Sequence, residues 1–293
     1  MIHPVPIPSG IDIRPDNTRV LVRSFIPGDH SAILRIIERA LAPTEEEIAD
    51  RLELLHVQFG DRHLRIELAW QRHYERVQHH VPRGDQLTAA RRLYIGSLFS
   101  GEYALESAAL FNPSIVPHPD QSGLAEGDLR FIMSLRATGE GHISSIEFRT
   151  GVVGADHSIV LEKPSRHVTA PQLNPDPSFR RSVFFGKLRE MEFENPWSQA
   201  LMQSLGDRFT RSELNAAIRT ACGATRPAAR LARRTTEGIR WLAEANYEVH
   251  FDPAMPISER IIFPVSPNES NGMEDARFVR FTDDDGTVTY YAT

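Results

Sequence analysis

The chain has 293 residues, with 33 Lys and Arg against 39 Asp and Glu, which gives a formal net charge of −6. This balance gives no electrostatic reason to expect a nucleic acid or an anionic membrane as the partner. The single cysteine excludes an internal disulfide framework, and neither a secretory signal nor an apolar run of transmembrane length is visible. The sequence therefore predicts a cytoplasmic enzyme or binding protein.

The first elements predicted along the chain are a short strand, "TRVLVRSF", and then helices over residues 29–98. Asp29 is a candidate N-cap, and Thr44 with Glu47 has the spacing of a capping box. Apolar residues recur at helical spacing in four successive stretches. We therefore assign residues 1–98 to an N-terminal helical region, whose helices we expect to pack as a unit beside the rest.

Short β-like runs replace the helical pattern in the remainder, residues 99–293. They include "LFNPSIVPHP", "LRFIMSLRA", "HISSIEFRTG" and "HSIVLEKP", and near the end "YEVHF", "ERIIFP", "ARFVRF" and "TVTYYAT". The last two should form a hairpin across "TDDDG", where Gly286 tolerates a positive φ. Many short strands without βαβ alternation favour a mainly β fold: a sandwich, a barrel or a propeller.

A helical insertion is predicted within this β part, at about residues 196–245. Pro196 suits a first helical position, Thr210 with Glu213 has the spacing of a second capping box, and Pro227 could begin a further helix. The chain then ends within a β-like run, "TVTYYAT", from which we expect the fold to continue beyond Thr293.

The stretch "ESNGMEDARF", residues 269–278, places acids directly before an apolar strand-like run. On an irregular loop such acids can point into a cleft, and Asp275 and Arg277, two positions apart, would face the same side of a strand. An aspartate and an arginine on one face can bind sugar hydroxyls. From spacing alone, however, a structural salt bridge or a solvated loop is the favoured interpretation.

Two further polar clusters precede it. In "SLRATGEGHISSIEFRTG", Arg136 ends one predicted strand while Glu147 and Arg149 lie on the next. An arginine between apolar strand residues could be a ligand contact or an edge-strand charge. In "ALFNPSIV", Asn112 precedes Pro113, a common turn sequence. The histidines lack metal-ligand spacing, and no glycine-rich phosphate loop is present, so neither a metal nor a bound cofactor is predicted.

These three clusters, in this order and spacing, resemble glycoside-hydrolase family 130, the β-mannoside phosphorylases and β-mannosidases. The family pattern has an N-P-S/A strand, an R-A strand and an E-D-P-R motif followed by a strand ending Y-Y-x-T-Y-T. Here the third motif reads Glu274-Asp275-Ala276-Arg277, with alanine in place of proline. The resemblance covers about residues 105–293 and not the helical N-terminus.

The resemblance implies a five-bladed β-propeller, incomplete in these residues, with its active site at the mouth of the central channel. It implies that Asp275 is the general acid, with a raised pKa that suits proton donation near neutral pH. It also implies that Asn112, Arg136, Glu274 and Arg277 bind the oligosaccharide. Inorganic phosphate would be the co-substrate of a phosphorylase, and phosphorolysis is slightly favoured over hydrolysis.

A second function class stays open at this point. The chain could be a non-catalytic carbohydrate-binding or assembly module, if it is naturally complete at Thr293. Neither a nucleic acid nor a membrane is expected as a partner in either case.

Overall fold

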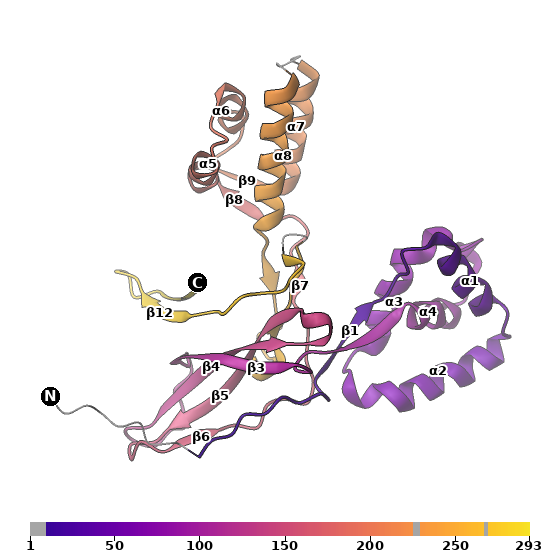
Figure 1. Ribbon diagram of the computed structural model, residues 1–293, viewed down its shortest axis with the longest axis horizontal. Coiled ribbons are helices and arrows are strands. Elements are labelled where there is room, and N and C mark those ends of the chain that lie inside the picture. Colours follow the sequence, from indigo (N-terminus) through magenta and orange to yellow (C-terminus); the bar gives the residue numbers. More distant parts are fainter. Residues whose placement is uncertain (1–9, 225–228, 267–268) are drawn as a thin grey trace. The chain divides into compact units, whose positions relative to one another are not determined.

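The computed structural model describes residues 10–224, 229–266 and 269–293 (Figure 1). Within these residues the chain divides into two compact units. The first comprises residues 10–170, 254–264 and 271–293, and the second comprises residues 171–253 and 265–270. Both helices and sheets are present, and no helix in the described ranges is long and apolar enough to cross a membrane.

Four α-helices occupy the stretch predicted to be helical. They are α1 (His30–Leu41), α2 (Glu45–Phe59), α3 (Ile66–Val77) and α4 (Ala89–Leu98). The predicted caps are confirmed: Asp29 accepts a hydrogen bond from the Ser31 N–H, and Thr44 and Glu47 form a reciprocal capping box. Such caps satisfy N–H groups that the first helical turn leaves unpaired.

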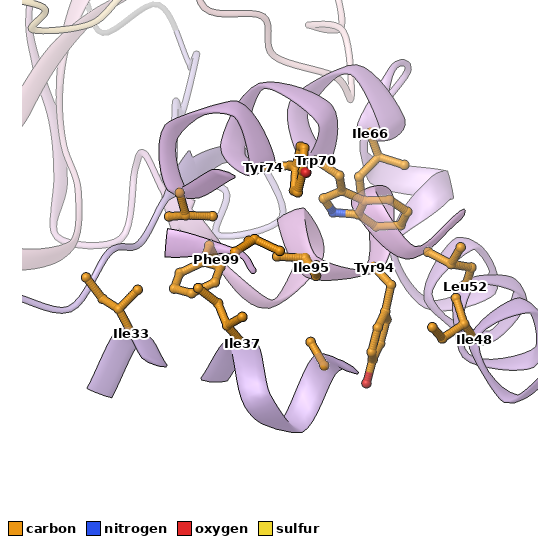
Figure 2. Close-up of a cluster of buried hydrophobic side chains, with 13 residues drawn as sticks. Ile33, Ile37, Ile48, Leu52, Ile66, Trp70, Tyr74, Tyr94, Ile95 and Phe99 are labelled. Atoms are coloured by element: carbon orange, nitrogen blue, oxygen red, sulfur yellow. The ribbon is translucent and has the colours of Figure 1, made fainter. Parts of the chain in front are cut away.

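These helices share one apolar core, drawn in Figure 2. Ile37, Trp70 and Ile95 come from three different helices and are at most 2% exposed. The periodic apolar positions of each helix therefore face one another, as amphipathic helices require. The two-stranded pair β1 (Val20–Ser24) and β2 (Ser100–Ala104) brackets this helical part in the sequence.

The main sheet of the first unit is antiparallel, with strand order β11-β5-β4-β3 and with β6 also paired to β5. Its strands are β3 (Ala109–Pro117), β4 (Leu129–Thr138), β5 (Ser144–Val153), β6 (Ile159–Leu161) and β11 (Ile261–Ile262). The predicted C-terminal hairpin is confirmed as β12 (Phe278–Thr282) and β13 (Val288–Ala292), with Gly286 at φ 84° in its turn.

The second unit contains the helices α5 (Arg181–Glu190), α6 (Pro196–Gln203), α7 (Arg211–Ala224) and α8 (Ala229–Ala245). Two short antiparallel pairs accompany them: β8 (Ser178–Arg180) with β9 (Arg208–Thr210), and β7 (Gln172–Leu173) with β10 (Val249–His250). The four helices contribute to one core of buried apolar residues.

Helix begins earlier in this unit than the predicted boundary at residue 196. Phe184 and Leu188, one helical turn apart, bury into the shared core and stabilise α5 ahead of it. Pro196 at the first position of α6 and the capping box of Thr210 with Glu213 are both confirmed. The helix start predicted at Pro227 lies outside the described residues.

Candidate functional site

The register of the main sheet decides which side chains share a face. Directly opposed residues of an antiparallel pair point to the same side. Arg136 of β4 is opposite Phe111 of β3, and Ser134 is opposite Ser114, so these four side chains lie on one face. That face carries the candidate site.

A β-bulge in β3 places Asn112 at this site. The pairing of β3 with β4 shifts between Phe111 and Ser114, and Asn112 has φ 53°, in the left-handed region that asparagine tolerates. The bulge frees the Asn112 side chain from strict strand alternation, and its Nδ2 donates to Asp275 Oδ2 at 2.5 Å. The Asn112-Pro113 pair, which the sequence suggested as a turn, thus lies in a bulge within β3.

The loop carrying the acids begins against β5. Gly272 forms an isolated parallel bridge with Ser144, and the Met273 N–H donates to Ser144 O at 2.9 Å. Gly272 has φ 94°, and a Cβ there would overlap the backbone of Ser144. Only glycine allows this close approach in this backbone conformation.

The same loop then continues to β4 and β3. Ser134 Oγ donates to Ala276 O at 3.3 Å, and Arg277 Nη1 donates to Pro113 O at 2.9 Å. The Phe278 N–H, at the start of β12, donates to Ser114 Oγ at 3.1 Å. The loop therefore crosses three strands of the sheet, which brings Asp275 to Asn112 although 163 positions separate them.

Asp275 is surrounded by nitrogen donors from three segments. In addition to the Asn112 amide, Arg136 Nη1 lies 3.5 Å from Asp275 Oδ1, and Arg277 Nη2 lies 3.8 Å from Asp275 Oδ2. The ion pair with Arg277 that the spacing favoured is therefore present, and Asn112 and Arg136 lie closer to the same carboxylate. The Asp275 side chain remains 31% exposed, so a ligand can reach it.

These donors lower the pKa of Asp275. The largest cause is the hydrogen bond from Asn112, and the contacts with Arg136 and the charge of Arg277 act in the same direction. The prediction of a raised pKa was wrong, because it assumed burial among carboxylates, whereas the carboxylate is accessible and is held by an amide and two guanidinium groups. In the free protein Asp275 is ionised at neutral pH.

Glu274 and Arg136 form the outer part of the site. Arg136 Nη1 donates to Glu274 Oε2 at 2.7 Å, but the Glu274 side chain is 88% exposed. The Arg136 guanidinium also lies over the Phe111 ring, 5.4 Å from its centroid, and its Nε is buried with no partner within the described residues. Arg136 thus contacts three side chains at once: the Phe111 ring, the exposed Glu274 carboxylate and the Asp275 carboxylate.

The second sequence cluster divides between the two faces of the sheet. Glu147 is opposite Leu135 and Arg149 is opposite Met133, so both point away from Asp275. There they bury with Arg19 and Glu106, and all four residues are at most 5% exposed. For Arg149, neither a ligand contact nor an edge-strand charge fits, because a buried ion network with Glu106 and Glu147 holds it.

Comparison of the chain with protein-family models, curated proteins and solved structures found no match. Its chemistry is therefore argued from the arrangement of its own side chains.

Sequence reasoning missed three residues of this site: Phe111, Ser114 and Ser134. Each contacts a residue that was predicted or supports the loop that carries it. Strand periodicity could have found Ser134, since it lies two positions before Arg136 and so faces the same side. No local signal identifies Phe111 and Ser114, because the bulge between them interrupts the alternation.

Replacing Gly272 by alanine is expected to destabilise the protein by about 1–3 kcal/mol and to displace the Asp275 loop. The matched control is Gly286→Ala, which has a similar positive φ but nothing within 4 Å of the added Cβ. The loss in melting temperature of Gly286→Ala measures the backbone strain that both variants share. Any larger loss in Gly272→Ala measures the overlap of the added Cβ with Ser144. Equal losses in the two variants would show that the contact with β5 does not position the loop.

Proposed function

We propose that this chain cleaves β-mannosides with inversion at the site around Asp275, by phosphorolysis in preference to hydrolysis. The observation that carries the proposal is the convergence of Asn112, Arg136 and Arg277 on one accessible carboxylate. These are the residues that the three family-like motifs supply, and they come from separate segments of the chain. A polar cluster assembled from several strands is typical of a small-molecule site.

The chemistry of these groups suits a sugar. A carboxylate accepts hydrogen bonds from hydroxyl groups, while guanidinium and amide groups donate to hydroxyl and ring oxygens. Asp275 would deliver a proton to the glycosidic oxygen, in line with the family resemblance. The nucleophile, phosphate or a base-activated water, would attack from the opposite face of the sugar. The five-bladed propeller implied by the resemblance is part of the same proposal.

The lowered pKa of Asp275 makes the pH dependence a sharp test. Only protonated Asp275 can donate a proton. Between pH 7 and pH 5 the pH lies above the pKa of this carboxyl, which the contacts with Asn112 and Arg136 lower. The protonated fraction rises about tenfold for each unit that the pH falls. We therefore expect kcat/KM, which reports the free enzyme, to rise about tenfold per unit from pH 7 to pH 5. A flat profile would mean that the proton comes from another group.

The direct test is to incubate the chain with β-linked manno-oligosaccharides, with and without inorganic phosphate. Mannose 1-phosphate formed only when phosphate is present would establish phosphorolysis, and free mannose would establish hydrolysis. Binding of the same oligosaccharides is measured in parallel by calorimetry. If neither product forms and the oligosaccharides do not bind, the proposal is refuted.

The second candidate is a carbohydrate-binding module without catalysis. The ionised state of Asp275 at neutral pH favours it, because an ionised carboxylate is a good acceptor for sugar hydroxyls but has no proton to give. Saturable binding of the oligosaccharides without either product, at pH 5 as well as at pH 7, would support this candidate.

A further inference from the structure

Two arginines lie directly opposite each other in the second unit. Strands β8 and β9 pair Arg180 with Arg208 in the register. Like charges at directly opposed positions of an antiparallel pair repel each other and are destabilising. The pair is held by its central residues, Phe179 and Phe209, whose ring centroids lie 5.6 Å apart in the buried core of this unit.

Within the described residues, neither arginine has an acidic partner. Arg208 donates to the Ser178 hydroxyl at 2.8 Å, while no hydrogen bond or ion pair engages the Arg180 side chain. The neighbouring acid, Asp207, is already engaged by Arg181, with 2.5 Å between Arg181 Nη2 and Asp207 Oδ1. Both side chains are exposed, so solvent screens the two opposed positive charges, but no carboxylate among the described residues pairs with either of them.

Two cavities meet at these arginines. Arg180 and Arg208 line both a cavity of about 580 Å³ and a second of about 400 Å³, sizes that suit small-molecule ligands. The larger cavity also presents Phe185 and Met202, and the smaller presents Leu242. Each cavity thus offers an apolar wall beside the same pair of cations.

We propose that the cleft between Arg180 and Arg208 binds a small molecule that carries a phosphoryl group next to an apolar ring. The dianionic phosphoryl group bridges the two guanidinium groups and removes their repulsion, since arginine matches the geometry of phosphate oxygens. The ring lies against the apolar wall of one of the two cavities. This site lies in the second unit and does not depend on the role proposed for Asp275.

Phenyl phosphate is the probe that contains both features, with inorganic phosphate and benzyl alcohol as probes of each feature alone. By calorimetry we expect phenyl phosphate to bind with a Kd below about 1 mM, inorganic phosphate to bind more weakly, and benzyl alcohol not to saturate. Equal affinity for phenyl phosphate and inorganic phosphate would overturn the apolar part of the proposal. If neither phenyl phosphate nor inorganic phosphate binds, the whole proposal is overturned.

The double variant Arg180→Gln/Arg208→Gln is expected to bind phenyl phosphate at least about tenfold more weakly. Its matched control is Arg233→Gln, an exposed arginine of the same unit that pairs with Glu237 at 3.1 Å and lines neither cavity. The control should bind as the unaltered chain does. Unchanged affinity in the double variant would show that binding occurs elsewhere.

Thermal melting without ligand distinguishes a binding role from a structural one. Because the double variant loses a repulsive pair, it should melt without ligand at the same temperature as the unaltered chain or higher. Phenyl phosphate should raise the melting temperature of the unaltered chain and leave that of the double variant unchanged. A lower melting temperature of the variant without ligand would mean that the arginines stabilise the strand pair, and would contradict the proposal.

Discussion

Asp275→Asn is expected to slow β-mannoside cleavage by about two to four powers of ten, the range that general acid catalysis contributes. The change removes the exchangeable proton while keeping the size and planarity of the side chain. Its Oδ1 atom can still accept the hydrogen bond that Asn112 donates to the carboxylate. Substrate affinity should change much less than kcat, since Arg136 and Arg277 remain.

The control for this variant is Asp120→Asn. Asp120 lies in the loop between β3 and β4 and is also accessible to solvent. Hydrogen bonds from Ser122 lower its pKa, and its carboxylate lies 3.7 Å from the guanidinium of Arg130 in β4. It therefore matches Asp275 in residue type, in the direction of its pKa shift and in having a neighbouring arginine, and it lies outside the candidate site. Both kcat and the melting temperature are measured for each variant. A destabilised Asp275→Asn variant that kept its activity per folded molecule would end the catalytic assignment.

Arg19→Met is expected to lower the free energy of unfolding of the first unit by about 3–5 kcal/mol, the cost of removing one partner from a buried ion pair. Arg19 is 1% exposed and donates to Glu106 Oε1 at 2.9 Å and to Glu147 Oε2 at 2.8 Å. It also donates to the carbonyls of Ser165 and Ser258, so it links four distant segments. Methionine fills similar space but leaves two buried carboxylates facing Arg149 alone.

The loss should be larger at pH 8 than at pH 5. Burial, followed by the charge of Glu147, raises the pKa of Glu106 to about 7. A carboxyl with a raised folded-state pKa stabilises the fold when it is protonated, and that stabilisation is lost as the pH rises through about 7. At pH 5 the variant can keep Glu106 neutral, and only Glu147 then needs Arg149.

Urea unfolding with hydrogen exchange of the β4 and β5 amides localises this effect to the first unit. The control is Arg14→Met, which breaks a 2.6 Å pair with Asp12 whose side chains are 82% and 63% exposed, and which should cost at most about 1 kcal/mol. Adding Glu147→Met to Arg19→Met should recover part of the loss, because both charges are then removed together. Equal losses for Arg19→Met and Arg14→Met would show that the buried network contributes no more than a surface pair.

Local sequence predicted the helices and the C-terminal hairpin because each is encoded within a few residues. The caps at Asp29, Thr44 and Thr210 were placed correctly, since a side-chain oxygen two or three positions from an N–H needs no distant partner. Gly286 marked the hairpin turn for the same reason. The early start of α5 was missed because burial of Phe184 and Leu188, rather than a cap, stabilises it.

The sequence by itself determined which residues are the candidates: Asn112, Arg136, Glu274, Asp275 and Arg277 stand in motifs that can be read directly. Tertiary structure alone decided what surrounds them. A β-bulge at Asn112 and the loop beginning at Gly272 bring Asn112 and Arg136 to Asp275, and the resulting donors lower the pKa that sequence reasoning expected to be raised. The physical reason is that strand register fixes the face on which a side chain lies, and electrostatic surroundings depend on groups more than a hundred positions away.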